Sequence, residues 1–167
     1  GLDWLVFMRE QGFGVCLADD MGLVKTVQLI AYLLHVHRTN QTFKPSFIIC
    51  PTSVLGNWQK ELARFAPDLD VHVHYGQTRS KDESLAVELG ALKPDVVLTA
   101  LGTVSQDADA LCEIEWCSVT LDEAQNIKNM HTKQSRAIRK LRGEHHLALT
   151  GTPVENRLSE LWAIFDF

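Results

Sequence analysis

The segment VCLADDMGLVKT, residues 15–26, decides the fold. It begins with a short apolar run at Val15–Ala18, passes through two acidic residues and a glycine, and enters a helical pattern at residues 25–37. A strand that leads through a short loop into a helix is the first half of a β-α-β unit, whose next strand runs parallel to the first. The segment therefore predicts an α/β domain.

Further apolar runs indicate the rest of the sheet. They lie at residues 47–50, 96–98, 119–121 and 147–149, and another strand is expected at residues 71–75. The four runs are short, rich in Val, Ile, Leu or Phe and not strictly alternating, which is typical of strands covered on both faces. Helical patterns alternate with them at residues 54–65, 83–92, 132–141 and 158–167. This order predicts a doubly wound parallel sheet with helices on both faces.

Composition limits the possible classes of protein. The chain has 167 residues, of which 46% are hydrophobic and 22% charged, so we expect one folded domain over residues 1–167. It has no run approaching the roughly 20 apolar residues of a membrane span, and a cytoplasmic location, or a nuclear one in a eukaryote, is expected. The net charge of -5 excludes a surface that binds polyanions everywhere, so a nucleic acid would need a local patch.

The chain ends and the cysteines give two smaller expectations. Helical patterns without capping signals lie at both ends, as expected for a piece cut from a longer protein. The four cysteines never form a CxxC pair, and we expect buried free thiols rather than metal ligands or disulfides. They are Cys16, Cys50, Cys112 and Cys117.

Ligands of such sheets bind at the carboxyl ends of the strands, so the loops there carry the candidate site. After the first strand, Lys25 and Thr26 open a helix, as in loops that cradle phosphates with backbone N–H groups and hold Mg²⁺ with a hydroxyl. The full pattern GxxxxGK[ST] is not met, because Asp19 and Val24 occupy its glycine positions. By itself, the pair is a weak signal, and an ordinary helix start explains it better. The candidate cofactor-binding residues are Asp20, Met21, Gly22, Leu23, Val24, Lys25 and Thr26.

Two later strand ends carry the remaining candidates. Asp122 and Glu123 follow the run at residues 119–121, and such a pair suits a Mg²⁺-holding carboxylate beside a group that orients the attacking water. A solvated loop is the simpler alternative. Thr150, Gly151 and Thr152 follow the last run; a hydroxyl-rich turn there could relay the state of a phosphate site, although a plain β-turn also explains it.

Together these stretches resemble the ordered motifs I, Ia, II and III of Swi/Snf-type ATPases in helicase superfamily two. The motifs cover the chain nearly end to end and in the expected order, and the wording DEAQ and PTSVLGNWQKEL is most similar to the bacterial branch. The stretches are LADDMGLVKT (17–26), ICPTS (49–53), LDEAQNIKN (121–129) and LTGTP (149–153).

The resemblance implies a RecA-like first lobe of the P-loop NTPase type that binds ATP and Mg²⁺. With a second RecA-like lobe of the same protein, it would move along double-stranded DNA and remodel protein–DNA complexes, acting on a DNA-bound protein. Lys25 would contact the phosphates, Thr26 and Asp122 would hold Mg²⁺, and Glu123 would position the attacking water. The residues expected near DNA or in coupling hydrolysis to movement are Pro51, Thr52, Ser53, Thr99, Thr150, Gly151 and Thr152.

Two departures from the family pattern leave alternatives open. The family has Gly where this chain has Val24, and a loop requiring positive φ there would carry strain of roughly 1–3 kcal/mol. The alternative is then a catalytically degenerate lobe that serves as a DNA- or protein-binding module. The arginine fingers of a second lobe are also absent from these residues, so the chain alone is expected to hydrolyse ATP slowly or not at all. An RNA helicase fits less well, because DEAQ and TGTP differ from its usual motifs.

A few other residues fit structural roles. His72 and His74 share a strand face, which indicates a polar face rather than a metal site. Trp58 and Trp162 lie in helical apolar patterns and are expected in the core. The basic run formed by Lys133, Arg136, Arg139, Lys140 and Arg142 fits a solvated helix face, with phosphate contact as the alternative.

Overall fold

The computed structural model describes residues 15–18, 22–39, 44–77, 79–80, 83–122, 133–143 and 145–150. The helical patterns expected at the two chain ends, including the one at residues 158–167, lie outside these ranges, as does Trp162.

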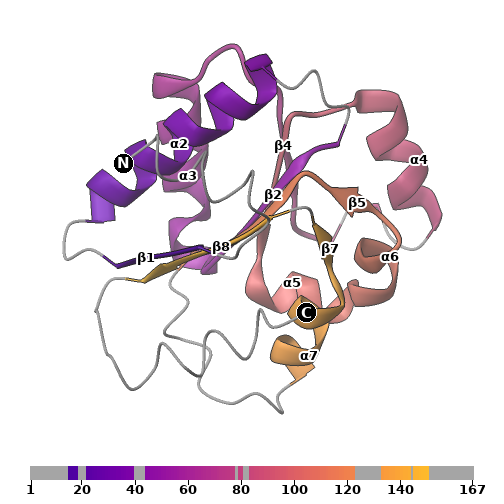
Figure 1. Cartoon of the computed structure of the whole chain (residues 1–167). Coiled ribbons are helices and arrows are strands. Elements are labelled where there is room, and N and C mark those ends of the chain that lie inside the picture. The colour runs from indigo at the N-terminus through magenta and orange to yellow at the C-terminus, as the bar shows by residue number, and fades with distance from the viewer. Residues whose placement is uncertain are drawn as a thin grey trace.

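A six-stranded sheet forms the centre of the fold, and every neighbouring pair in it is parallel (Figure 1). Its order, β1-β8-β6-β2-β4-β3, places strands distant in sequence side by side. The predicted strands are all present, most of them one or two residues longer than expected. They are β1 (Val15–Ala18), β2 (Ser46–Cys50), β3 (Val71–His74), β4 (Val96–Ala100), β6 (Ser118–Leu121) and β8 (His146–Thr150).

Helices cover both faces of this sheet, as predicted (Figure 1). One face carries α2 (Gly22–Thr39) and α3 (Leu55–Phe65). The other carries α4 (Glu83–Leu92), α5 (Leu101–Gln106), α6 (Ala108–Cys112) and α7 (Lys133–Lys140). The strands are apolar on both sides because alternate residues enter two separate cores. Ile48 belongs to the first cluster and Phe47 to the second.

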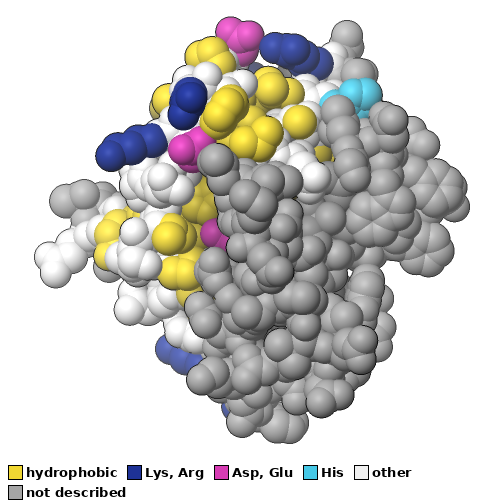
Figure 2. All heavy atoms as spheres, turned by 90° about the vertical axis from the view of Figure 1, so that its left-hand side faces the viewer, with side chains coloured by type: hydrophobic (Ala, Val, Ile, Leu, Met, Phe, Trp, Pro, Cys, Tyr) yellow, Lys and Arg dark blue, Asp and Glu magenta, His cyan; other side chains and the backbone are white. Residues whose placement is uncertain are grey.

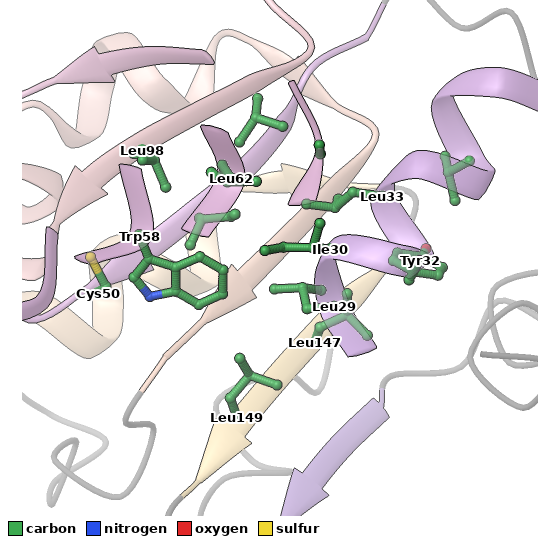
Figure 3. Packing of buried hydrophobic residues seen from close by; sticks show 14 of the residues in the cluster. Leu29, Ile30, Tyr32, Leu33, Cys50, Trp58, Leu62, Leu98, Leu147 and Leu149 are labelled. Carbon is green, nitrogen blue, oxygen red and sulfur yellow. The ribbon is translucent and has the colours of Figure 1, made fainter. Parts of the chain in front are cut away.

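The first core fixes the position of α2 and α3 against the sheet (Figure 3). Leu29, Ile30 and Leu33 of α2 lie over Leu147 of β8, while Trp58 of α3 lies beside Cys50 of β2. Trp58 is only 2% exposed, so its expected place in the core is confirmed. Cys50 and Cys117 are buried and Cys112 half-buried, and all three are free thiols as predicted; the side chain of Cys16 is not described.

Several short elements were not predicted. They are the 3-10 turn η1 (Thr52–Val54), the helices α5 and α6, and a separate parallel pair formed by β5 (Glu115–Trp116) and β7 (Arg142–Gly143). Elements this short contain too few residues to display a hydrophobic period. Among the helices that the structure describes, none combines the length and apolar character needed to cross a membrane.

Candidate active site

Three neighbouring strands deliver candidate residues to one edge of the sheet. In the parallel register, Ala18 at the end of β1 pairs with Thr150 at the end of β8, and Ala148 of β8 pairs with Leu121 at the end of β6. Asp122 follows β6 directly. The segment entering α2, the TGTP stretch and the DEAQ stretch therefore leave the sheet at the same, carboxyl edge, where ligands of such folds bind.

Helix α2 begins at Gly22, three residues earlier than the sequence pattern indicated. Lys25 and Thr26 consequently belong to its first turns, and the first turn contains no acidic residue. Unpaired N–H groups and the helix dipole make such an N-terminus favourable for anions. Thr26 is half-buried, whereas the side chain of Lys25 is not described.

The start of α2 changes the interpretation of Val24. This residue lies inside the helix, where φ is negative and a β-branched side chain is tolerated. The strain expected for a loop residue with positive φ therefore does not arise in this structure. The hypothesis of a degenerate lobe rested on that strain and loses its physical support.

Asp122 is held at both its backbone and its side chain. Its backbone N donates a hydrogen bond of 2.8 Å to the carbonyl oxygen of Ile49 in the adjacent β2. The indole Nε1 of Trp58 donates a bond of 2.9 Å to Oδ2 of the Asp122 carboxylate. Because the carboxylate is partly exposed, the indole orients it without removing it from the surface.

The charge of this carboxylate also affects the pKa of the nearby Cys50 thiol. Burial, followed by the negative charge of Asp122, raises the pKa of Cys50 to about 12. The thiol accordingly stays protonated and donates a weak hydrogen bond of 3.7 Å to the Thr99 carbonyl oxygen. Cys50 is thus an inert core residue rather than a nucleophile.

The residues around Asp122 fit a magnesium ion. An oriented, partly exposed carboxylate at the carboxyl edge of the sheet is the hard oxygen ligand that Mg²⁺ prefers. Mg²⁺ takes only one or two such protein ligands beside phosphates and water. The hydroxyl-bearing Thr26 lies near the start of α2, which follows a strand ending at the same edge.

The residues expected near DNA divide into two groups. Thr52 and Ser53 are exposed in η1, directly after β2, and Pro51 is half-buried. Thr99 is fully buried in β4, where its hydroxyl donates a bond of 2.7 Å to the His74 carbonyl oxygen. The Thr99 hydroxyl is therefore used inside the protein, and the expectation that the region around Thr99 lies near DNA stays a prediction.

Five candidate residues lie outside the ranges that the structure describes: Asp20, Met21, Glu123, Gly151 and Thr152. The backbones of Gly22, Leu23, Val24, Lys25 and Thr150 belong to described elements, but their side-chain surroundings are not described. Their roles remain predictions.

A cluster of charged groups beyond the end of β3 was not predicted. His74 Nε2 and Arg79 Nε each lie 2.7 Å from Oδ2 of Asp107, and Arg79 also donates to the Gly76 carbonyl oxygen and to Gln106. The His74 side chain is fully buried and that of Asp107 is 7% exposed. Burial by itself raises the pKa of Asp107, but hydrogen bonds from Arg79 and His74 bring it below its ordinary value. The only signal for it in the sequence was weak: two histidines, His72 and His74, that alternate with valines in this strand.

The described charges are dispersed on the face that Figure 2 shows, whereas helix α7 carries several cations close together. In Figure 2, Lys and Arg side chains are scattered singly on the side of the molecule that it shows, with acidic side chains between them. On α7, Lys133, Arg136 and Lys140 are exposed along a hollow of about 290 Å³ that also includes Asp109. The exposure of these cations agrees with a solvated helix face.

Comparison with known proteins agrees with this architecture. The family model of the SNF2-related domain matches residues 1–167. The chain is 60% identical over its whole length to YwqA of Bacillus subtilis (strain 168), a protein assigned by name to the ATP-dependent helicases and translocases, and it spans 18% of that protein. It is 35% identical over its whole length to the ISWI chromatin-remodeling complex ATPase ISW2 of Saccharomyces cerevisiae, of which it spans 15%.

A solved structure gives the same result in three dimensions. The Sulfolobus solfataricus SWI2/SNF2 ATPase core in complex with dsDNA superposes with a TM-score of 0.82 at 43% identity. The superposition covers 98% of this chain and 33% of the solved chain. The chain thus corresponds to a minor part of each of these relatives.

Proposed function

Because the chain belongs to the SNF2-related domain family, we propose that it is the ATP-binding lobe of a DNA-dependent ATPase that translocates on double-stranded DNA and remodels protein–DNA complexes. The observation that carries the proposal is the oriented carboxylate of Asp122 at the sheet edge where β1 and β8 also end. This arrangement supports a site for a nucleotide and a divalent cation rather than a passive binding surface.

The nucleotide would bind at the start of α2. Its helix N-terminus would receive phosphate oxygens, Lys25 would contact them, and Thr26 and Asp122 would hold the Mg²⁺. When bound, Mg²⁺ neutralises charge on the phosphate oxygens. Glu123, the next residue after Asp122, would orient the attacking water.

Double-stranded DNA would lie across the exposed part of the same edge. The hydroxyls of Thr52 and Ser53 are exposed there, and hydroxyls and backbone amides can contact phosphates without a basic surface. This agrees with the dispersed charges and with the net charge of -5. The proposal is also supported by the similar archaeal core, which was solved in complex with dsDNA.

A second lobe of the same protein would complete the enzyme, and Thr150, Gly151 and Thr152 would couple hydrolysis to its movement. Because transition-state charge in phosphoryl transfer is stabilised by arginine fingers from another element, the chain alone should turn over ATP very slowly. A DNA-bound protein is the expected substrate of the complete machine.

The test is ATP hydrolysis by the full natural protein that carries this chain. We expect stimulation by double-stranded DNA, weaker stimulation by single-stranded DNA and none by RNA of the same length. Equal stimulation by RNA, or an absence of stimulation by duplex DNA, would contradict the proposal. Displacement of a triplex-forming strand from duplex DNA then tests translocation separately from hydrolysis.

A further inference from the structure

The core residue Trp58 uses its only polar side-chain atom, the indole Nε1, for a hydrogen bond to the candidate site. Its ring is 2% exposed and packs in the cluster between α2, α3 and the sheet (Figure 3). A buried indole N–H needs an acceptor, since leaving it unpaired costs stability. The acceptor here is Oδ2 of Asp122, 2.9 Å away and 64 residues later in the chain. A Phe or Leu would fill apolar space but could not make this bond.

We propose that Trp58 is a positioning residue, whose indole N–H fixes the Asp122 carboxylate in the orientation that holds Mg²⁺. This inference rests on the proposed function, in which Asp122 is a magnesium ligand. A neutral N–H donor suits the task, because it orients a carboxylate without cancelling the charge that attracts the cation. Hydrogen bonds of this kind behind a metal ligand typically contribute 10- to 100-fold to metal affinity or activity.

The surroundings of both residues leave the carboxylate little freedom. The backbone of Asp122 is tied to Ile49 of β2 by a 2.8 Å hydrogen bond. Trp58 is set by α3, where Leu55 and Leu62, one turn before and one turn after it, are buried in the same cluster. The helix α3 is thereby linked directly to the end of β6. Removing the indole N–H at position 58 should consequently weaken Mg²⁺ binding more than nucleotide binding without Mg²⁺.

A second buried tryptophan supplies a matched control. Trp116 is 1% exposed and its Nε1 also donates one hydrogen bond, of 3.2 Å, to the Leu111 carbonyl oxygen. It lies in the cluster on the opposite face of the sheet, stacked on Phe47. Replacing Trp116 by Phe removes an indole N–H from the core just as Trp58→Phe does. Of these two tryptophans, Trp58 bonds to Asp122 and Trp116 does not, so a loss of packing common to both variants is separated from the effect on the metal site.

The experiment measures how Mg²⁺ controls binding of a fluorescent ATP analogue to the full natural protein. For Trp58→Phe we expect the half-saturating Mg²⁺ concentration to rise about tenfold, with binding in EDTA unchanged. Trp116→Phe should leave both values as in the unchanged protein. Incorporation of 3-benzothienylalanine at position 58 replaces only the N–H by sulfur and keeps the ring volume, and should reproduce the shift. Thermal unfolding of each variant establishes that it is folded.

The outcomes separate this inference from the proposed function. If the unchanged protein binds the analogue without any dependence on Mg²⁺, or if Asp122→Asn leaves that dependence intact, the proposed function fails. If Asp122→Asn abolishes the dependence while the benzothienylalanine variant keeps the normal half-saturating concentration, the positioning role of Trp58 is wrong. An equal shift in Trp116→Phe would likewise overturn it, because the effect would then come from core packing.

Discussion

Two carboxylates at the carboxyl edge of one sheet are treated differently by the fold. Asp107, beyond the end of β3, is 7% exposed and is held by the guanidinium of Arg79 and the imidazole of His74. Asp122, at the end of β6, is partly exposed and accepts a hydrogen bond from the neutral indole of Trp58. The strands β2 and β4 separate the two sites. A cation neutralises the carboxylate with which it pairs, whereas the hydrogen bond from an indole adds no positive charge. We call Asp107 with Arg79 and His74 the closed site, and Asp122 with Trp58 the open site.

Removing the charge at the open site should have the largest effect. In Asp122→Asn, the side-chain oxygen can still accept the hydrogen bond from Trp58, so the fold should keep nearly all of its stability. A weaker ligand for Mg²⁺ should lower DNA-stimulated ATP hydrolysis on the order of 100-fold or more, corresponding to several kcal/mol of lost charge stabilisation. Hydrolysis rates and thermal unfolding of the full natural protein check both parts. A normal rate would mean that Asp122 is not a metal ligand.

The same substitution at the closed site, Asp107→Asn, should lower stability and leave Mg²⁺ binding unchanged. Asp107→Asn removes the negative partner of the nearly buried Arg79, and breaking such a pair costs about 3 kcal/mol of unfolding free energy. The Mg²⁺ dependence of nucleotide binding should stay unchanged, since two strands separate Asp107 and its partners from Asp122. Denaturant unfolding measures the loss. Asp68→Asn, which breaks the exposed 3.4 Å pair with Arg38, is the control and should change stability little.

The closed site should also make stability sensitive to acid. Burial lowers the pKa of His74 below its ordinary 6.5, with Asp107 only partly offsetting this, so the folded state favours the neutral imidazole. Below pH 6.5 the unfolded chain takes up this proton more readily, and stability falls. The lowered pKa of Asp107 adds to the loss as the pH falls through and below 3.8, because the unfolded chain again binds the proton first. Unfolding free energies measured between pH 7 and pH 4 should decline, and His74→Gln should flatten the decline. If the unfolding free energy of His74→Gln declined with falling pH as steeply as that of the unchanged protein, His74 would not be the group responsible.

The two sites also differ in how far the sequence predicted them. The order of buried strands and helices could be predicted because all strands of the large sheet except β3 are apolar runs and the long helices have a hydrophobic period. Asp122 directly follows one of these runs. Trp58 was correctly placed in the core, but its bond to Asp122 joins residues 64 positions apart, which local periodicity does not encode. The cluster around Asp107 depends on the short helices α5 and α6, whose few residues display no period.

Position 24 gives the smallest expected effect and tests whether the open site is already formed at the start of α2. In the structure Val24 has helical backbone, so replacing it by Gly relieves no strain. Val24→Gly should instead lower stability by roughly 0.3–0.5 kcal/mol through helix propensity, and less if the first turn is tolerant. Nucleotide affinity, measured by calorimetric titration of Mg·ATP into the full natural protein, should change by less than about twofold. A loop that needed positive φ would give a gain of roughly 5- to 150-fold, the equivalent of about 1–3 kcal/mol of strain. A gain of that size would mean that α2 unwinds past residue 24 when nucleotide binds, and the degenerate-lobe hypothesis would regain its support.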